Sequence, residues 1–348
     1  MNPYILATLL LGLGLGTTAT FASSHWLLAW MGLEINTLAI LPLMAQHHHP
    51  RAIEATTKYF LTQATAAAML LFASTTNAWL SGQWEIQQTT HPLPLTMLTL
   101  ALALKVGLAP VHIWLPEVLQ GLDLTTGLVL STWQKLAPFI LLLQIQPASP
   151  SLLLLLGLAS TLVGGWGGLN QTQLRKVLAY SSVAHLGWMI LVLQFSPALT
   201  TLALLTYLVM TFSTFLTFKL NNATNINSLT TSWTKAPALT VITPLLLLSL
   251  GGLPPLTGFM PKWLILQELT KQDLALAATF AALTALLSLY FYLRLSYAMA
   301  LTMSPNTLAG VTPWRLLSSQ VTLPLATSAM ATTLLLPVAP ATVALLTM

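Results

Sequence analysis

Long apolar runs, separated by short polar or proline-containing breaks, repeat from one end of this chain to the other. Within its 348 residues we recognise eleven runs, near residues 3–22, 24–45, 58–80, 93–120, 125–146, 148–169, 174–195, 198–220, 238–270, 274–301 and 322–347. A bilayer core of about 30 Å is crossed by about 20 apolar residues in a helix, so each run is long enough for one crossing. The pattern predicts an all-α fold, a polytopic transmembrane bundle of about 11 helices that forms a single domain over residues 1–348.

The composition excludes an ordinary soluble protein. Hydrophobic residues make up 55% of the chain and charged residues only 5%, whereas a soluble domain needs a far more charged surface. Because the chain contains no cysteine, it cannot hold an iron–sulfur cluster or a cysteine-ligated zinc ion, so redox chemistry must lie in a partner. The basic residues are spread thinly between the apolar runs, where they set membrane topology, and we expect no nucleic-acid partner.

The basic residues of the loops predict how the chain is oriented. Met1 to Phe21 already spans a bilayer and has no cleavage signal, so we expect the first run to be a retained helix. If all eleven runs cross, the loops opposite the amino terminus carry only Lys271. The amino terminus is therefore expected on the inner side and the carboxyl terminus outside. The basic residues on the amino-terminal side are Arg51, Arg175, Lys176, Lys235 and Arg315, with Lys219 near a helix end.

Two of the runs are unusually long, contain proline in their middles and match each other in sequence. Residues 107–117 and 252–262, which lie 145 residues apart, both read Gly-Leu-x-Pro, three residues, an aromatic, Leu or Met, and Pro. Proline removes a backbone hydrogen bond from a helix, which a membrane tolerates only where protein or water satisfies the freed groups. We therefore expect broken helices that mark the transport path at Pro110, Pro116, Pro254, Pro255 and Pro261.

The matched pair predicts an inverted internal repeat. The two copies lie in the fourth and ninth runs, five crossings apart, so the second is inserted upside down relative to the first, as in many transporters. We expect two five-helix repeats, at about 1–146 and 148–301, and an extra helix at about 322–347. The alternative is a pair of ordinary proline-kinked helices, but the matched, inverted positions favour the repeat.

Four ionisable residues lie well inside apolar runs: Glu34, Lys105, Lys135 and Lys262. A charge near the bilayer centre costs roughly 2.5–3.5 kcal/mol, so each of them needs a partner or a function. Burial favours a neutral amine and a nearby carboxylate favours a charged one, so a lysine whose partner moves away releases its proton. We interpret these residues as candidates for proton translocation. The alternative is one structural ion pair, with the remaining lysines snorkelling to the membrane surface.

The histidines form two further groups of candidate functional residues. His112 lies inside the first break and His185 in the middle of an apolar run, so both are candidates for a hydrogen-bonded proton relay, although each is equally explained as a packed histidine. His47, His48 and His49 have no acidic cluster beside them and point in different directions in a loop, so we predict no metal site.

Four stretches together are characteristic of one family: Met31–Asn36, Lys105–His112, Ser181–Trp188 and Gly251–Trp263. Through them the chain resembles, over its whole length, the antiporter-like membrane subunits of mitochondrial NADH-ubiquinone oxidoreductase, the respiratory complex I. Most antiporter-like subunits of that family have more helices, and the lower number here resembles the animal mitochondrial form.

The resemblance implies a proton-translocating subunit with no redox centre of its own. Glu34 and Lys105 would form a switching pair, Lys135 would pass protons centrally and Lys262 would serve the exit half of the channel. The resemblance also implies that this chain holds no cofactor, and that NADH, FMN, iron–sulfur clusters and ubiquinone bind elsewhere in the complex. The expected partners are other complex I subunits, including neighbouring antiporter-like subunits, and membrane lipids. The expected location is the mitochondrial inner membrane, with the amino terminus on the matrix side and the carboxyl terminus on the intermembrane-space side.

Two rival functions share most of these features. An independent secondary cation/proton antiporter normally binds its second ion through intramembrane carboxylates, and Glu34 is the one clear candidate in the sequence. A purely structural membrane scaffold would tolerate an apolar residue at Lys105 or Lys262. The sequence therefore favours the pump subunit.

Overall fold

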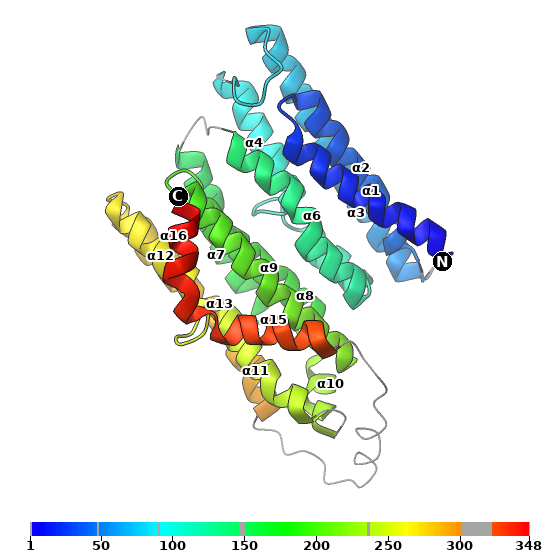
Figure 1. Cartoon of the computed structure of the whole chain (residues 1–348), viewed down its shortest axis with the longest axis vertical. Helices are drawn as coiled ribbons and strands as arrows, with labels where there is room; N and C mark the ends of the chain where they lie inside the picture. Colours follow the sequence, from blue (N-terminus) through cyan, green and yellow to red (C-terminus); the bar gives the residue numbers. More distant parts are fainter. Residues whose placement is uncertain are drawn as a thin grey trace. The chain divides into compact units, whose positions relative to one another are not determined.

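The computed structural model of the chain describes residues 2–46, 49–89, 91–145, 150–234, 237–300 and 322–347. Lys235 and Arg315, which helped to predict the orientation, and His47 and His48 lie outside the described residues. The described residues form fifteen α-helices and two short 3-10 helices, and strand-type pairing among them is limited to two isolated bridges (Figure 1). The predicted all-α fold class is confirmed.

The chain divides into two compact units, Met1–Leu156 and Gly157–Met348. In the first unit α1 packs along α2, and α3 contacts α2, α4 and α5, while α6 contacts α1, α2 and α4. Its helices are α1 (Pro3–Ala22), α2 (Trp26–Met44), α3 (Pro50–Ser81), α4 (Pro92–Val106), α5 (Trp114–Gly121) and α6 (Leu124–Gln144), with α7 (Pro150–Gly168) crossing into the second unit.

In the second unit α9 contacts α8, α11, α12, α15 and α16, and α13 packs on α11 and α12. Its helices are α8 (Leu174–Val192), α9 (Pro197–Leu220), α10 (Ile226–Thr230), η1 (Thr231–Thr234), α11 (Pro237–Gly251), α12 (Phe259–Lys271), α13 (Ala275–Ala300), α15 (Thr322–Leu334), η3 (Leu336–Val338) and α16 (Ala339–Thr347).

Every one of the eleven predicted runs coincides with a helix or a consecutive helix pair. Six described helices, α1, α2, α6, α7, α9 and α13, are long and apolar enough to cross a bilayer on their own. The runs at 93–120 and 238–270 are each split into two shorter helices, α4 with α5 and α11 with α12. The helix α8 is less apolar than these six helices. Because 16 of its 19 residues are buried inside the protein, most of its surface faces other protein segments.

The run at 322–347 is not the single helix that the sequence predicts. It forms α15, η3 and α16, with a bend of 65° at Leu335, between Leu323–Leu334 and Leu336–Thr342. Pro337 and Pro340 stand at this point, and a proline inside a helix removes a hydrogen bond and collides with the preceding turn. The bend therefore follows from two prolines, which the length and hydropathy of the run do not reveal.

The two units repeat the same local details. His25, between α1 and α2, forms an isolated bridge with Glu85, and Gln173, between α7 and α8, forms the same kind of bridge with Asn225. Each unit also contains a short helix that ends at a left-handed glycine, followed by an irregular break and a second short helix. These structural similarities agree with an internal repeat within the chain. The repeat boundaries and the inversion stay predictions.

Candidate functional site

The break between α4 and α5 places Lys105 at a helix end. α4 stops at Val106 because Gly107 adopts a φ of 87°, a left-handed conformation that glycine accepts without strain. Trp114, the first residue of α5, folds back so that its indole N–H donates to the carbonyl oxygen of Leu104 at 3.1 Å. The Ala109–Pro110 peptide bond within the break is cis, and Pro116 stands in the first turn of α5, where a missing N–H costs little.

The break between α11 and α12 has the same design. Gly252, with a φ of 79°, follows the last residue of α11, and the Pro254–Pro255 bond is cis. Pro261 stands in the first turn of α12, as Pro116 does in α5. The neighbouring Lys262 reaches back to the end of α11, where its Nζ donates to the carbonyl oxygen of Gly251 at 2.7 Å and lies 3.5 Å from that of Leu250.

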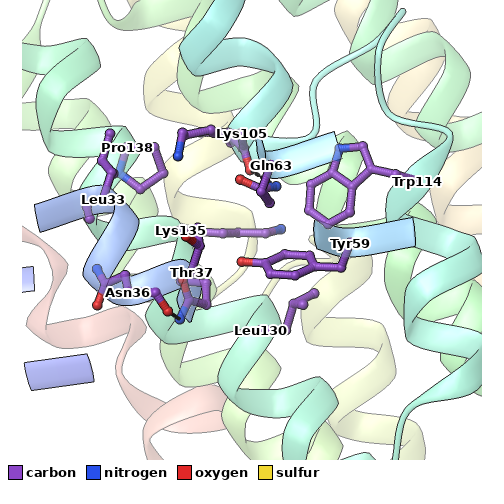
Figure 2. Close-up of a pocket in the computed structure, with 13 residues that line it drawn as sticks. Leu33, Asn36, Thr37, Tyr59, Gln63, Lys105, Trp114, Leu130, Lys135 and Pro138 are labelled. Atoms are coloured by element: carbon purple, nitrogen blue, oxygen red, sulfur yellow. Dashed lines mark hydrogen bonds between the residues drawn. The ribbon is translucent and has the colours of Figure 1, made fainter. Parts of the chain in front are cut away.

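A small polar cavity lies inside the first unit, beside its broken helix (Figure 2). Its volume is about 20 Å³, enough for about one water molecule. Side chains from α2, α3, α4, α5 and α6 line it: Leu33, Asn36, Thr37, Tyr59, Gln63, Lys105, Val106, Trp114, Leu130, Gln134, Lys135, Ala137 and Pro138. Two of the four predicted ionisable residues, Lys105 and Lys135, thus line the same cavity.

Lys105 is buried, and its amine has no hydrogen-bond partner among the described residues. The residue is 6% exposed, and its Nζ is enclosed. It stands in the last turn of α4, where the negative end of the helix dipole stabilises a cation. The charged form of this amine is therefore stabilised by the helix dipole rather than by a fixed hydrogen bond. An amine without a fixed hydrogen bond is free to exchange a proton.

Lys135 enters the cavity from α6. The residue is 3% exposed, and Figure 2 shows its side chain extending across the cavity beside Gln63 and Tyr59. The preceding residue, Gln134, ties α6 to α2, since its amide Nε2 donates to the backbone oxygen of Asn36 at 3.3 Å. The structure therefore brings Lys105 and Lys135 together at one site.

Glu34 stands at the edge of this site rather than inside it. It is partly buried on α2 and does not line the cavity, although Leu33 and Thr37 beside it do. Its carboxylate Oε2 accepts a hydrogen bond from the Thr37 hydroxyl at 2.9 Å. Its charge acts on Lys105 and on Tyr59, but within the described part of the chain no ion pair joins Glu34 to Lys105.

The remaining predicted residues lie elsewhere. In the second unit His185 is buried on α8, with its ring centroid 5.6 Å from that of Tyr207. Lys262 lies on α12 and donates a hydrogen bond to the last residue of α11. In the first unit His112 lies in the break, half-buried, with Nδ1 3.3 Å from the carbonyl oxygen of Pro110. Neither histidine lines the cavity that holds Lys105 and Lys135.

The position that corresponds to Lys262 in the first break is occupied by Glu117, ten residues after Gly107. Glu117 forms an ion pair of 2.8 Å with Lys58 of α3 on the protein surface. Lys58 also pairs with Glu54 at 2.8 Å, and this hydrogen-bonded ammonium lowers the pKa of the Glu54 carboxyl below its usual value. The ion pair between Glu117 and Lys58 thus joins α5, the second part of the first broken helix, to α3.

The sequence prediction missed several uncharged members of the cavity. Tyr59 and Gln63 lie four residues apart, which places them on one face of α3, and both are almost fully buried. Asn36 lies on α2, two residues after Glu34, with both amide atoms enclosed and unpartnered among the described residues. Their signal in the sequence was the presence of polar side chains inside apolar runs, which a search restricted to charges passes over.

Comparison with known proteins identifies the family. The model of the NADH:quinone oxidoreductase/Mrp antiporter transmembrane family matches residues 23–288, and the model of the NADH dehydrogenase subunit 2 C-terminus matches residues 289–343. NADH-ubiquinone oxidoreductase chain 2 of Tetraodon nigroviridis is 75% identical, with 98% of each chain covered, and that of Gadus morhua is 72% identical, with 100% of each covered.

A solved structure adds agreement in three dimensions. A chain in the structure of respiratory complex I from Thermus thermophilus with bound aureothin is 30% identical and superposes with a TM-score of 0.80, over 96% of this chain and 80% of that one. Because the family models, the full-length relatives and this fold all agree, the chain belongs to the NADH:quinone oxidoreductase/Mrp antiporter family, in its NADH-ubiquinone oxidoreductase chain 2 branch.

Proposed function

We propose that this chain is the antiporter-like, proton-translocating membrane subunit of a mitochondrial NADH:ubiquinone oxidoreductase. Its relatives carry the name of that enzyme, and its broken helices and buried amines are the features expected of a proton path. The observation that carries the proposal is the pair Lys105 and Lys135 in one polar cavity beside a helix break.

Each ionisable residue has a proposed role. Glu34, whose charge acts on Lys105, biases that amine between its charged and neutral states, and Lys135 exchanges protons with it through the cavity. Lys262 carries protons in the second unit, where His185 is a further candidate, while His112 serves the first break. The broken helices supply backbone carbonyls and helix ends that stabilise the charge in transit.

The rest of the machinery belongs to other subunits. NADH, FMN, iron–sulfur clusters and ubiquinone are proposed to bind outside this chain, which has no cysteine for a cluster. Its proposed partners are other complex I subunits, including neighbouring antiporter-like ones, and the lipids of the mitochondrial inner membrane. The amino terminus is proposed to face the matrix and the carboxyl terminus the intermembrane space.

The test compares proton transport with electron transfer in the assembled enzyme. The complex that contains Lys105→Met, or Lys135→Met, is purified, reconstituted into liposomes and assayed for NADH-to-ubiquinone electron transfer and for protons moved per NADH. We expect a particle of normal size that moves fewer protons per NADH. The control is Lys271→Met, because this lysine is exposed at the end of α12.

Normal proton yield in both buried-lysine variants would overturn the proposal in favour of a structural role. A separate outcome concerns the unmodified chain. Isolation as a lone or homo-oligomeric particle, without NADH oxidation, would identify an independent cation/proton antiporter instead.

A further inference from the structure

Tyr59 brings a hydroxyl group into the cavity that holds Lys105 and Lys135. The residue lies on α3 and is 2% exposed to the outside of the protein. Figure 2 shows its phenol ring beside the Lys135 side chain, with the hydroxyl directed into the space that the lining residues surround. Within the described part of the chain this hydroxyl makes no hydrogen bond, and the charge of Glu34 acts on it.

Among the other polar side chains of the cavity, the Asn36 amide and the Lys105 amine have no hydrogen-bond partner in the described part of the chain, whereas Thr37, Gln63 and Gln134 are engaged. The Thr37 hydroxyl donates to the Glu34 carboxylate at 2.9 Å. The amides of Gln63 and Gln134 donate to the backbone oxygens of Lys105, at 3.5 Å, and of Asn36, at 3.3 Å. Among the lining residues, hydroxyl groups belong to Thr37 and Tyr59, so the uncommitted hydroxyl is that of Tyr59.

Because the Lys105 amine has no hydrogen-bond partner among the described residues, a proton that passes between the two amines needs a group between them that both accepts and donates. A lysine ammonium is a hydrogen-bond donor only, whereas its neutral amine can accept. A hydroxyl donates and accepts at once, so it can take a proton on one lone pair while it releases its own. An amide lacks an O–H or a basic nitrogen to do the same. Among the side chains that line the cavity, this requirement singles out the phenol of Tyr59.

The surroundings of Tyr59 hold it in place for this task. Its ring meets that of Trp114 edge to face, with centroids 5.7 Å apart. The Trp114 indole is fixed in turn by its hydrogen bond to the carbonyl of Leu104, the residue before Lys105. The break in the helix thus positions both the phenol and one of the two amines.

We propose that Tyr59 is a proton-carrying residue that links Lys135 to Lys105. The inference rests on the proposed function of the chain and adds Tyr59 to the residues of its proton path. In one step the Lys135 ammonium gives a proton to the phenol oxygen while the phenol O–H gives its proton to the neutral Lys105 amine, directly or through one water molecule. Tyrosine ends neutral as it began, one positive charge moves from Lys135 to Lys105, and the reverse step restores the starting state.

The experiment uses the assembled complex in liposomes and the variant Tyr59→Phe, which keeps the ring and its contact with Trp114 but removes the hydroxyl. We expect proton transfer through this subunit to slow on the order of 10²-fold, the usual contribution of a positioned proton donor. The complex should then show the same loss of protons per NADH as Lys135→Met. The matched control is Tyr290→Phe, since Tyr290 is exposed on α13.

A second variant separates a chemical from a structural role. In Tyr59→His the imidazole can both donate and accept, so we expect it to recover part of the proton yield that the Phe variant loses. Recovery supports the relay, and it also decides the matter if the Phe variant does not assemble. Equal loss in the His and Phe variants would overturn the relay and leave Tyr59 a packing residue.

The outcomes for the relay and for the proposed function are distinct. If Tyr59→Phe pumps normally while Lys135→Met does not, the tyrosine inference is wrong and the function stands. If Lys135→Met itself pumps normally, the proposed function is wrong as well.

Discussion

The ammonium of Lys262 caps the helix that precedes its own, donating to the carbonyl oxygen of Gly251 at 2.7 Å across the break between α11 and α12. Gly252 makes this contact possible, because a methyl group there would come within 3.1 Å of three atoms of the lysine side chain. A candidate proton carrier is therefore also a structural cap, and the two roles need to be tested separately.

Lys262→Met is expected to lower stability and proton transport together. The substitution leaves the Gly251 carbonyl without its donor, a loss that costs about 1–3 kcal/mol for a buried group. Lys262→Arg keeps a donor in place but holds its charge permanently, so we expect near-normal stability without proton transfer. Thermal inactivation of the detergent-extracted complex and protons moved per NADH report the two effects. Normal pumping by the Arg variant would show that Lys262 is a cap alone.

Gly16→Ala is expected to disturb the contact of α1 with α2. A methyl group at Gly16 would lie 2.8 Å from the carbonyl oxygen of Gly32 and 2.6 Å from Oδ1 of Asn36. Such overpacking typically costs about 1–3 kcal/mol. Gly14→Ala is the matched control two residues away, since a methyl group there meets nothing within 4 Å. The yield and thermal stability of the assembled complex should fall for the first variant, and equal values for both would contradict the argument.

Trp114→Phe is expected to loosen the first helix break. It removes the indole N–H that donates to Leu104 but retains an aromatic ring against Tyr59. The lost hydrogen bond is worth about 1 kcal/mol, to be detected as a lower midpoint of thermal inactivation. Trp79→Phe, at a residue that is 89% exposed, provides the control. An unchanged midpoint in Trp114→Phe would mean that the break is held by its other contacts.

The sequence predicts the helices and the breaks well because both depend on local chemistry. Apolar run length determines where a helix can cross, and a Gly-Leu-x-Pro segment forces an interruption wherever it occurs. The bend between α15 and α16 is equally local, but the two prolines that cause it lie inside a run that was judged by its length. The predicted orientation rests on loop charges, of which Lys235 and Arg315 lie outside the described residues. The predicted repeat inversion rests on the number of crossings between the two matched breaks.

The site is harder to predict because it depends on which helix faces meet. The positions of Lys105 and Lys135 in apolar runs reveal that both are unusual, but only the packing of α3, α4 and α6 shows that they share a cavity. Glu34, expected as a direct partner of Lys105, points instead to Thr37 one turn along its own helix. The uncharged members Asn36, Tyr59 and Gln63 show in the sequence only as polar side chains inside apolar runs, which does not reveal that they face one cavity.

The matched breaks carry opposite charges at the same position, Glu117 in the first copy and Lys262 in the second. One is tied to a surface lysine and the other to a buried carbonyl oxygen. Two identical halves inserted in opposite orientations would form a proton path with the same chemistry on both sides of the membrane. With the predicted opposite insertion, a difference in the sign of one charge makes the two faces of the chain chemically distinguishable, which is the minimum requirement for transport with a preferred direction.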